Sequence, residues 1–322
     1  MSRQQWEVTA DESGVRLDKF LADDSRLGSR GRAVWALERG KVFVNDADVA
    51  SADAGRRLVA GDRIGLWLDR PGSARPRVRQ PAVLEAGLQV VHEDDGIIVV
   101  NKPAGMLSVP LPSRANAPSV QSALADYYPA RGKRRPLVVH RIDRDTSGLV
   151  LFATRPDVQQ QLKDQFRRHE PLRIYLAFVY GTPDPAEGTW RDHLVWDDDD
   201  LIQKATHARD PRGRESRSDY RVVESFGAAS LIEVRLITGK RNQIRLQARQ
   251  RGHTLIGEQR YTYGPDTLRP IAFPRQALHA HQLTIVHPMS GESLHFEAPL
   301  PDDLRALWRR LRSGLGSSRG RH

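Results

Sequence analysis

Hydrophobic residues near the start of the chain recur at helical spacing. Leu17, Phe20 and Leu21 form one such set, and a second set around Val34 to Leu37 stops at Gly40, as a helix ending at a glycine would. Alternating apolar patterns typical of short strands follow at 42–44 and 64–68. The pattern predicts a small domain of two helices and a small sheet over residues 1–70.

Residues 71–82 mix proline, glycine and arginine without apolar periodicity, which indicates a linker. Beyond it, strand patterns dominate: 88–92, 97–101, 149–153, 174–180, 219–223, 231–237, 281–286 and 294–296. Helical patterns are fewer: 119–128, 157–169, 241–251 and 302–311. The helices are too few and too irregularly placed for a regular βαβ succession.

The prediction is therefore an α+β fold: a larger domain over 83–312 with a mixed, largely antiparallel sheet and flanking helices, after a small N-terminal α/β domain. The polar, charge-rich stretch 197–218 is predicted to be a long loop. The basic, small-residue stretch 313–322 is predicted to be a disordered tail.

The charge balance of the chain indicates a class of binding partner. Lysine and arginine number 50 against 40 acidic residues, a formal net charge of +10, and the excess is mostly arginine, which suits planar recognition of phosphate. The balance favours a nucleic acid partner, although a merely basic soluble surface would show it too.

The absence of cysteine excludes disulfides and cysteine-ligated zinc or iron–sulfur sites. The longest apolar runs, such as Ile97 to Val100, are far shorter than a membrane span, and the first ten residues contain no apolar signal core. We expect a soluble, cytoplasmic protein that is a monomer and has no membrane partner.

The densest polar stretch runs from His140 to Gly148, between the apolar runs 137–139 and 149–152. A loop anchored by two buried strands can hold a charged group rigidly in a cleft. Asp143 lies between Arg141 and Arg144, and nearby opposite charge favours its ionised form. From these residues alone, a salt-bridged surface turn explains the stretch equally well.

The sequence HRIDRDTSGL over 140–149 resembles the signature of RluA-type RNA pseudouridine synthases. Further landmarks of that family follow in its order: EDDGIIVVNKPAG at 93–105, RIYLAFVYG at 173–181, LITGKRNQIRLQ at 236–247, GHTLIGEQRY at 252–261, LHAHQLTIVHP at 278–288 and the closing FEAPLPDDL. The resemblance covers about residues 88 to 311. It implies an isomerase that breaks the bond from ribose to uracil nitrogen, rotates the base and rejoins it through carbon five, without a metal or cofactor.

The resemblance implies three catalytic residues: Asp143, Arg245 and Tyr175. Asp143 would act as a nucleophile on ribose or as a base on a sugar carbon, and both roles require an ionised carboxylate close to the substrate. Arg245 would pair with that carboxylate. Tyr175 would lie against a uracil that has been flipped out of its helix, although a core aromatic on a strand is the alternative.

Further residues are implied as RNA or substrate contacts: His140, Arg141, Thr146, Lys102, Gln243 and Arg241. Arg141 would fill the space left by the flipped base or form a structural salt bridge. Lys102 is mainly architectural in this interpretation, with a phosphate contact as its second role. Arg241, Arg245 and Arg249 are predicted to share one helix face at i, i+4, i+8.

The chain departs from the family pattern at Lys240, Asn242 and Gln247, where TGRTHQIRVH is commoner, and at 108–110, where the family often carries a histidine. None of these departures removes Asp143 or Arg245. They concern finer substrate contacts rather than the reaction.

In the N-terminal region, RLDKFL, SR, GKVFVN and AGDRI are similar to the RNA-binding domain named after ribosomal protein S-four. A small domain without a nucleic acid role is the alternative. With such a module, large-subunit ribosomal RNA is the first expected substrate and transfer RNA the second.

Other functions fit less well. Asp145 to Gly148 resembles an aspartic protease loop but lacks a second equivalent loop, and Asp143 with Asp145 as a glycosidase pair leaves the basic charge unexplained. His279 and His281 would face the same way on a strand, but no third metal ligand stands at a recognisable spacing. A catalytically silent RNA-binding or ribosome-assembly factor is the non-enzyme alternative, and the intact Asp143 and Arg245 argue against it.

Overall fold

A computed structural model describes residues 3–49, 51–68, 83–84, 87–111, 117–128, 135–262, 265 and 268–314. The predicted linker 71–82 and residues 315–322 of the predicted tail lie outside these ranges. Of the described residues, none belongs to a helix long and apolar enough to cross a membrane.

The N-terminal part contains a four-stranded antiparallel sheet in the order β1-β4-β2-β3. Its strands are β1 (Arg3–Glu7), β2 (Val42–Val44), β3 (Ala47–Asp48) and β4 (Arg63–Trp67). Two helices pack on it, α1 (Leu17–Leu21) and α2 (Arg30–Glu38), as their apolar spacing predicted. Strand β1 was not predicted, because its sequence RQQWE has no apolar alternation.

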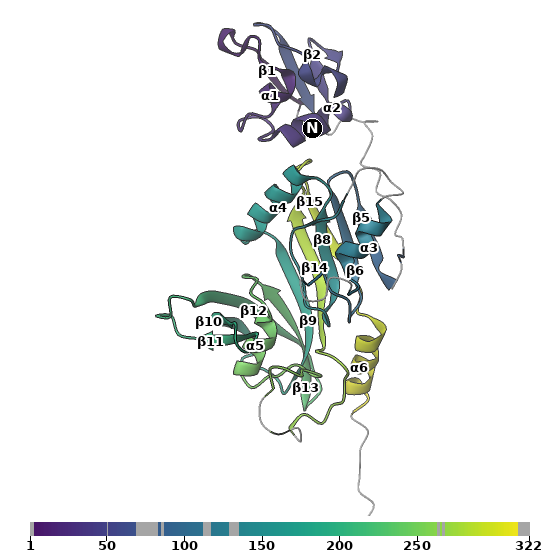
Figure 1. Ribbon diagram of the computed structural model, residues 1–322, viewed down its shortest axis with the longest axis vertical. Helices are drawn as coiled ribbons and strands as arrows, with labels where there is room; N and C mark the ends of the chain where they lie inside the picture. The colour runs from purple at the N-terminus through teal and green to yellow at the C-terminus, as the bar shows by residue number, and fades with distance from the viewer. Residues whose placement is uncertain are drawn as a thin grey trace, which may run out of the picture.

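The second part is built on an eleven-stranded sheet (Figure 1). Its main path runs β11-β10-β12-β13-β9-β14-β8-β6-β5, with β15 paired to β14 and β7 paired to β8. The strands are β5 (Gln89–Glu93), β6 (Ile97–Lys102), β7 (Leu137–Val138), β8 (Ser147–Ala153), β9 (Leu172–Tyr180), β10 (Glu187–Asp197), β11 (Ile202–Thr206), β12 (Arg214–Ser225), β13 (Ala229–Leu236), β14 (Leu278–Val286) and β15 (Ser293–Glu297). Within the described ranges β8 and β14 are the one parallel pair, so the predicted mixed, largely antiparallel α+β fold is confirmed.

Strands β6 and β8 form the centre of the core because both of their faces are covered. Side chains of β8 are buried throughout, and alternate residues join different hydrophobic clusters: Leu149 and Leu151 face one way, Val150 and Phe152 the other. Helix α4 (Pro156–Arg167) covers the first face and α3 (Val120–Tyr127) the second. Helices α5 (Gln243–Gln250) and α6 (Asp302–Arg312) complete the domain.

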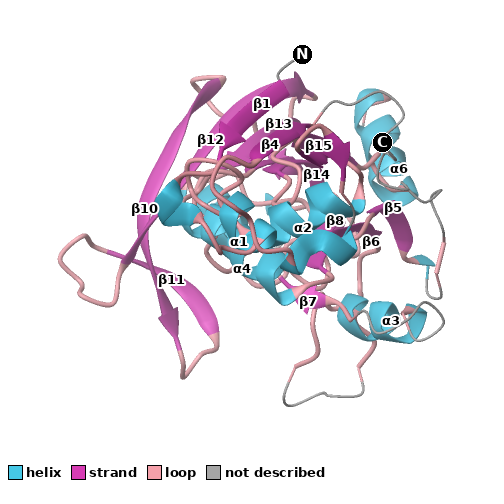
Figure 2. Cartoon of the chain, turned by 90° about the horizontal axis from the view of Figure 1, so that it is seen from above, coloured by secondary structure: helices cyan, strands magenta, loops and turns pink. Residues whose placement is uncertain are grey.

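The prediction of a long loop over 197–218 is wrong. Strand β11 and the first part of β12 occupy much of this stretch, and with β10 they form a ribbon that extends from the body of the domain (Figure 2). Within 197–218 the buried positions of the ribbon carry polar side chains, Gln203 on β11 and Ser216 and Ser218 on β12. Because buried and exposed positions are both polar, the stretch shows no apolar alternation and its sequence looks like that of a loop.

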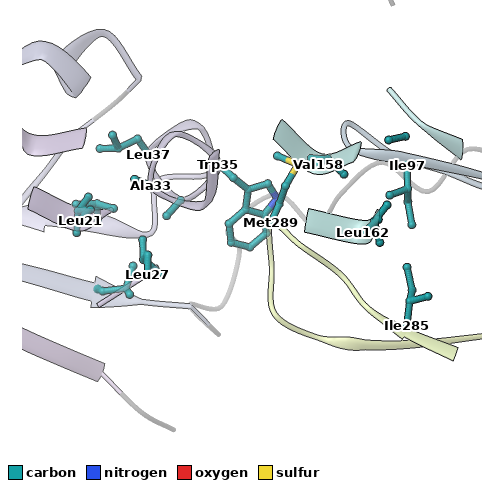
Figure 3. Packing of buried hydrophobic residues seen from close by; sticks show 14 of the residues in the cluster. Leu21, Leu27, Ala33, Trp35, Leu37, Ile97, Val158, Leu162, Ile285 and Met289 are labelled. Carbon is teal, nitrogen blue, oxygen red and sulfur yellow. The ribbon is translucent and has the colours of Figure 1, made fainter. Parts of the chain in front are cut away.

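The two parts of the chain share one hydrophobic cluster. The indole of Trp35, on α2, packs beside Met289 and Val158 of the second part (Figure 3) and is 5% exposed. Close by, Arg39 Nη2 lies 2.9 Å from Asp95 Oδ2. The N-terminal part is therefore docked on the start of α4 and the turn before β15, rather than merely tethered.

Candidate active site

The segment 139–146, which joins β7 to β8, is held on both sides of Asp143. Before it, Ser108 Oγ donates to Ile142 O at 2.8 Å and accepts from Ile142 N at 3.1 Å. After it, Arg144 O accepts from Lys102 Nζ at 2.8 Å and from Gly105 N at 2.9 Å. Because the backbone is fixed at both neighbours, the Asp143 side chain has a defined position.

Gly148 brings this loop close to the centre of the sheet. Its φ of +114° lies in the region that L side chains rarely adopt, and a Cβ there would lie 2.2 Å from Ala280 O. Only glycine lets β8 approach β14 at this point, immediately after the loop.

A cleft opens over the loop, bounded by the end of α4, strand β9, the segment 239–242 and helix α5. Nine residues were predicted as catalytic or substrate-contacting, and eight of them line this cleft: Asp143, Arg245, Tyr175, His140, Arg141, Thr146, Gln243 and Arg241. The tertiary structure thus brings together residues up to 105 positions apart in the chain, from His140 to Arg245.

Asp143 faces a guanidinium that is itself fixed. Arg245 Nη1 lies 3.3 Å from Asp143 Oδ2 and donates to Asn242 Oδ1 at 3.0 Å. The other edge of the guanidinium makes two bonds to Glu258, Nε to Oε2 at 2.7 Å and Nη2 to Oε1 at 2.6 Å. Burial lowers the pKa of Arg245, but the Glu258 carboxylate outweighs it and the pKa is raised overall. Arg245 therefore presents a permanent positive charge to a half-buried carboxylate.

Glu258 is a residue of the site that the sequence interpretation missed. Its carboxylate is fully buried, and besides Arg245 it accepts from the backbone N–H groups of Arg260 and Tyr261 at 2.8 and 3.1 Å. Burial raises the pKa of Glu258, and the Arg245 bonds more than reverse this, so the group stays ionised. The signal was present, because Glu258 is the one acid in the landmark GHTLIGEQRY.

Tyr175 lines the cleft from β9 and is 8% exposed. Burial raises the pKa of its phenol to about 12. The ring is therefore neutral over the physiological range and offers a flat apolar surface with a hydroxyl donor.

His140 is held neutral. Its Nε2 accepts the backbone N–H of Leu151 at 3.0 Å, so the single proton of the ring is on Nδ1. The imidazole stacks on Phe166 with a centroid distance of 4.7 Å. Burial, assisted by the charge of Arg173, lowers the pKa of His140 to about 3.

Arg141 and Arg241 are exposed cations of the cleft, as is Arg167 at the C-terminal end of α4. Arg141 has no carboxylate within ion-pair distance among the residues that the structure describes, so the structural salt bridge considered for it is absent there. The guanidinium of Arg241 lies 4.1 Å from the ring centroid of Trp196 on β10. The predicted helix face shared by Arg241, Arg245 and Arg249 is wrong, because α5 starts at Gln243 and Asn242, with φ +53°, breaks the helical path before it.

Lys102 does not reach the cleft, and its predicted phosphate contact is corrected. The side chain is fully buried, and Nζ donates to Pro103 O at 2.9 Å, Met106 O at 2.8 Å and Arg144 O at 2.8 Å. Three protons serve three carbonyl oxygens, which leaves none for a ligand. Burial lowers the pKa of Lys102 to about 7. Its role is architectural.

Thr146 and Gln243 contribute to the walls of the cleft, but both are buried. The Gln243 amide donates to Arg217 O and Ser218 Oγ, each at 3.0 Å, and accepts from Thr238 Oγ1 at 2.8 Å. Its predicted polar contact with a substrate is therefore corrected to a contact with the fold. Thr146 Oγ1 accepts from Gln276 Nε2 at 3.4 Å.

His279 and His281 use their nitrogens on the protein. His279 Nδ1 bonds Ser147 Oγ at 2.9 Å and Nε2 bonds Ala298 O at 3.1 Å, while His281 Nδ1 bonds the same carbonyl at 2.8 Å. Within the described ranges no three histidines or acids stand close enough together to hold a metal. The expectation that these histidines are hydrogen-bonded is met.

Several known proteins similar to this chain have the same activity in their names. Residues 96–250 match the family model described as RNA pseudouridylate synthase. An uncharacterised RNA pseudouridine synthase of Synechocystis is 33% identical, covering 97% of this chain and 95% of its own. Ribosomal large subunit pseudouridine synthase D of Zymomonas mobilis is 33% identical, and the match covers 97% of this chain and 98% of the relative. The protein of the same name from Neisseria meningitidis serogroup A is also 33% identical, and the match covers 97% of this chain and 83% of the relative.

The fold has solved counterparts. Human RNA pseudouridylate synthase domain containing 4 matches 69% of this chain and 92% of its own with a TM-score of 0.58 at 22% identity. At that identity the likeness concerns the fold alone, whereas the sequence relatives cover nearly the whole chain at above 30%. The chain therefore belongs to the RluA-type RNA pseudouridine synthase family and is an isomerase.

Proposed function

We propose that this protein isomerises specific uridines of structured RNA with Asp143 as the catalytic carboxylate, without a metal or cofactor. The observation that carries the proposal is the contact of Asp143 with Arg245 at the floor of a cleft that Tyr175 also lines. An ionised carboxylate is required whether the aspartate attacks ribose or removes a proton from a sugar carbon. Arg245, charged and fixed by Glu258, orients the carboxylate.

The substrate base enters the cleft by flipping out of its helix, because a stacked uridine hides its glycosidic bond. Tyr175 then receives the uracil face, an interaction worth about 1 to 3 kcal/mol per stacked base. Arg141 is suited to occupy the space that the base leaves, since it is exposed at the mouth of the cleft, two residues from Asp143, and has no acidic partner within the described part of the chain.

Large-subunit ribosomal RNA is the first substrate we propose, and transfer RNA the second. The support is the name of the relatives from Zymomonas and Neisseria, each matched over 97% of this chain. An enzyme acting on these RNAs would work in the cytoplasm, in keeping with a chain that has no cysteine. We propose that it works as a monomer.

The N-terminal part, residues 1–70, is proposed as an RNA-binding domain of the ribosomal protein S-four type, joined by a linker at 71–82 to a catalytic domain at 83–312. The support is the resemblance of its sequence to that domain and the basic residues at the start of α2. Arg30 at the first turn of α2 is exposed, although its guanidinium also pairs with Asp18 at 2.8 Å.

The test is pseudouridine mapping of total RNA from cells with and without the gene, complemented by the wild type or by Asp143→Asn. We expect one or a few sites to vanish with the gene and to return only with the wild type. Sites in transfer RNA would establish the second substrate. Sites restored by Asp143→Asn would refute the assignment of the carboxylate, and an unchanged map would favour a silent RNA-binding or assembly factor.

A further inference from the structure

Arg173 is a buried cation of the cleft that has no acidic partner. It lies on β9 two residues before Tyr175, and both side chains line the cleft. Arg173 is 8% exposed. Its Nη2 donates to Ile237 O at 2.8 Å, whereas its buried Nε makes no hydrogen bond. Among the described residues no carboxylate stands within ion-pair distance of it.

The other buried arginines near this cleft are neutralised, which makes Arg173 the exception. Arg245 pairs with Glu258 and Asp143, and Arg275 pairs with Asp303 through Nε at 2.7 Å and Nη2 at 3.0 Å. A buried charge without a partner is costly to the folded protein. Such a cost is tolerated where strain or an unpaired group serves binding, because a ligand of opposite charge then removes it.

Gly239 makes room for the Arg173 guanidinium in the cleft wall, because a Cβ at Gly239 would lie 2.7 Å from Arg173 Nη1. The cleft is also strongly positive: Lys240, Arg141 and Arg241 line it in addition, whereas Asp143 is the one acid among its lining residues. A cleft with this excess of positive charge favours the binding of an anion.

We infer that Arg173 binds a nonbridging phosphate oxygen of the RNA strand at the target uridine, which anchors the flipped nucleotide while Tyr175 receives its base. The inference rests on the proposed function. Residues i and i+2 of a strand are about 6.6 Å apart, comparable with the span from the base to the backbone of one nucleotide. The planar guanidinium suits phosphate because it can donate through two parallel N–H groups.

The test uses the full-length protein and the hairpin RNA in which mapping locates the modified uridine. Binding is measured in an Asp143→Asn background, so that affinity is read independently of turnover. Arg173→Met should weaken binding by about 10- to 100-fold, the range of a hydrogen bond to a charged group. The plot of log affinity against log salt should become shallower by about 0.7 to 0.9. Arg173→Lys, which retains the charge, should recover a large part of both the affinity and the salt slope.

A matched control is Arg235→Met. Arg235 is exposed on the adjacent strand β13 and does not line the cleft, so its removal should change neither affinity nor salt slope. If Arg173→Met does not fold, Arg173→Gln takes its place, since an amide can still donate to Ile237 O but carries no charge.

The phosphate itself is tested with single neutral methylphosphonate linkages on either side of the target uridine. At one of these linkages, the protein that retains Arg173 should lose about as much affinity as the Arg173→Met substitution costs on unmodified RNA. The Arg173→Met protein should lose little further affinity at that linkage. Unchanged affinity and salt slope in Arg173→Met would overturn the inference. Equal losses by both proteins at every linkage would also overturn it and would assign Arg173 to the uracil oxygens. Lack of turnover by the wild type on this hairpin would instead count against the proposed function.

Discussion

Glu258 and Arg245 form a buried two-bond ion pair, and the one remaining guanidinium nitrogen of Arg245, Nη1, points at Asp143. The pair fixes the plane of the guanidinium before any substrate is present. Asp143 therefore meets a counter-charge whose position is set by the fold rather than by the carboxylate itself.

Glu258→Gln should destabilise the protein and slow turnover together. Removal of one partner from a buried pair costs about 3 to 5 kcal/mol, which urea unfolding would measure. Arg245 would lose its fixed orientation, so we expect kcat to fall by roughly tenfold or more with a smaller change in KM. Glu258→Asp is the conservative control and should recover part of the stability. Wild-type kcat in a folded Glu258→Gln protein would show that the pair is structural only.

Asp143→Asn should fold and bind RNA but lose isomerisation by about 100-fold or more, since it removes the charge and the nucleophilicity while keeping the shape. Arg245 retains Glu258, so the fold should be preserved. Asp145→Asn is the matched control. The Asp145 carboxylate is engaged by Arg144, with both bonds at 3.1 Å, and lies outside the cleft lining, so most activity should remain. The opposite result for the two variants would identify Asp145 as the catalytic acid.

His140 should make the folded protein sensitive to acid. Its pKa is about 3 in the folded state against an ordinary value of 6.5, so between these values the unfolded chain binds more protons. The free energy of unfolding should therefore fall as pH drops below 6.5, by at most about 1.4 kcal/mol per pH unit from this residue.

The variant His140→Gln keeps an acceptor for the N–H of Leu151 but does not titrate. Urea unfolding near pH 7 and near pH 5 should show a smaller loss of stability for the variant than for the wild type. The pKa of His279 is also lowered, to about 4, but this residue is unchanged in both proteins and cancels in the comparison. Equal losses would mean that His140 takes up its proton in the folded state as well.

Deletion of Met1 to about Arg79 should leave a folded catalytic domain with weaker RNA binding. Each phosphate contact removed should reduce the slope of log affinity against log salt by about 0.7 to 0.9. The truncation also uncovers Met289 and Val158, which Trp35 covers, so its stability should fall. Equal slopes and affinities would show that the N-terminal part does not bind RNA, and an insoluble product would place the domain boundary elsewhere.

Activity should survive exhaustive treatment with a metal chelator and should need no added nucleotide. The prediction rests on the sequence, which has no phosphate-cradling glycine loop and no cysteine-based metal motif. A short, prefolded RNA hairpin is the suitable substrate, because it separates catalysis from ion-dependent RNA folding. Loss of activity that a divalent ion restores without altering the hairpin would contradict it.

The fold class and the position of the reacting loop follow from patterns along the chain. The apolar run after His140 to Gly148 is continuous because β8 is covered on both faces, so that every side chain of the strand is buried. The order of the landmark motifs predicted Asp143, Arg245 and Tyr175, and the cleft contains all three. Periodicity failed along β11 and the start of β12, because the buried positions there are Gln203, Ser216 and Ser218 rather than apolar residues.

Which polar residues are free to contact a substrate depends on three-dimensional packing. Lys102 and Gln243 look like substrate contacts in the sequence, but their donors bond to the fold. Glu258 and Arg173 look ordinary in the sequence, yet one completes the ion pair of Arg245 and the other lies buried in the cleft wall with an unused Nε. Partners of a buried polar group come from distant segments, so their identity depends on packing in three dimensions rather than on spacing along the chain.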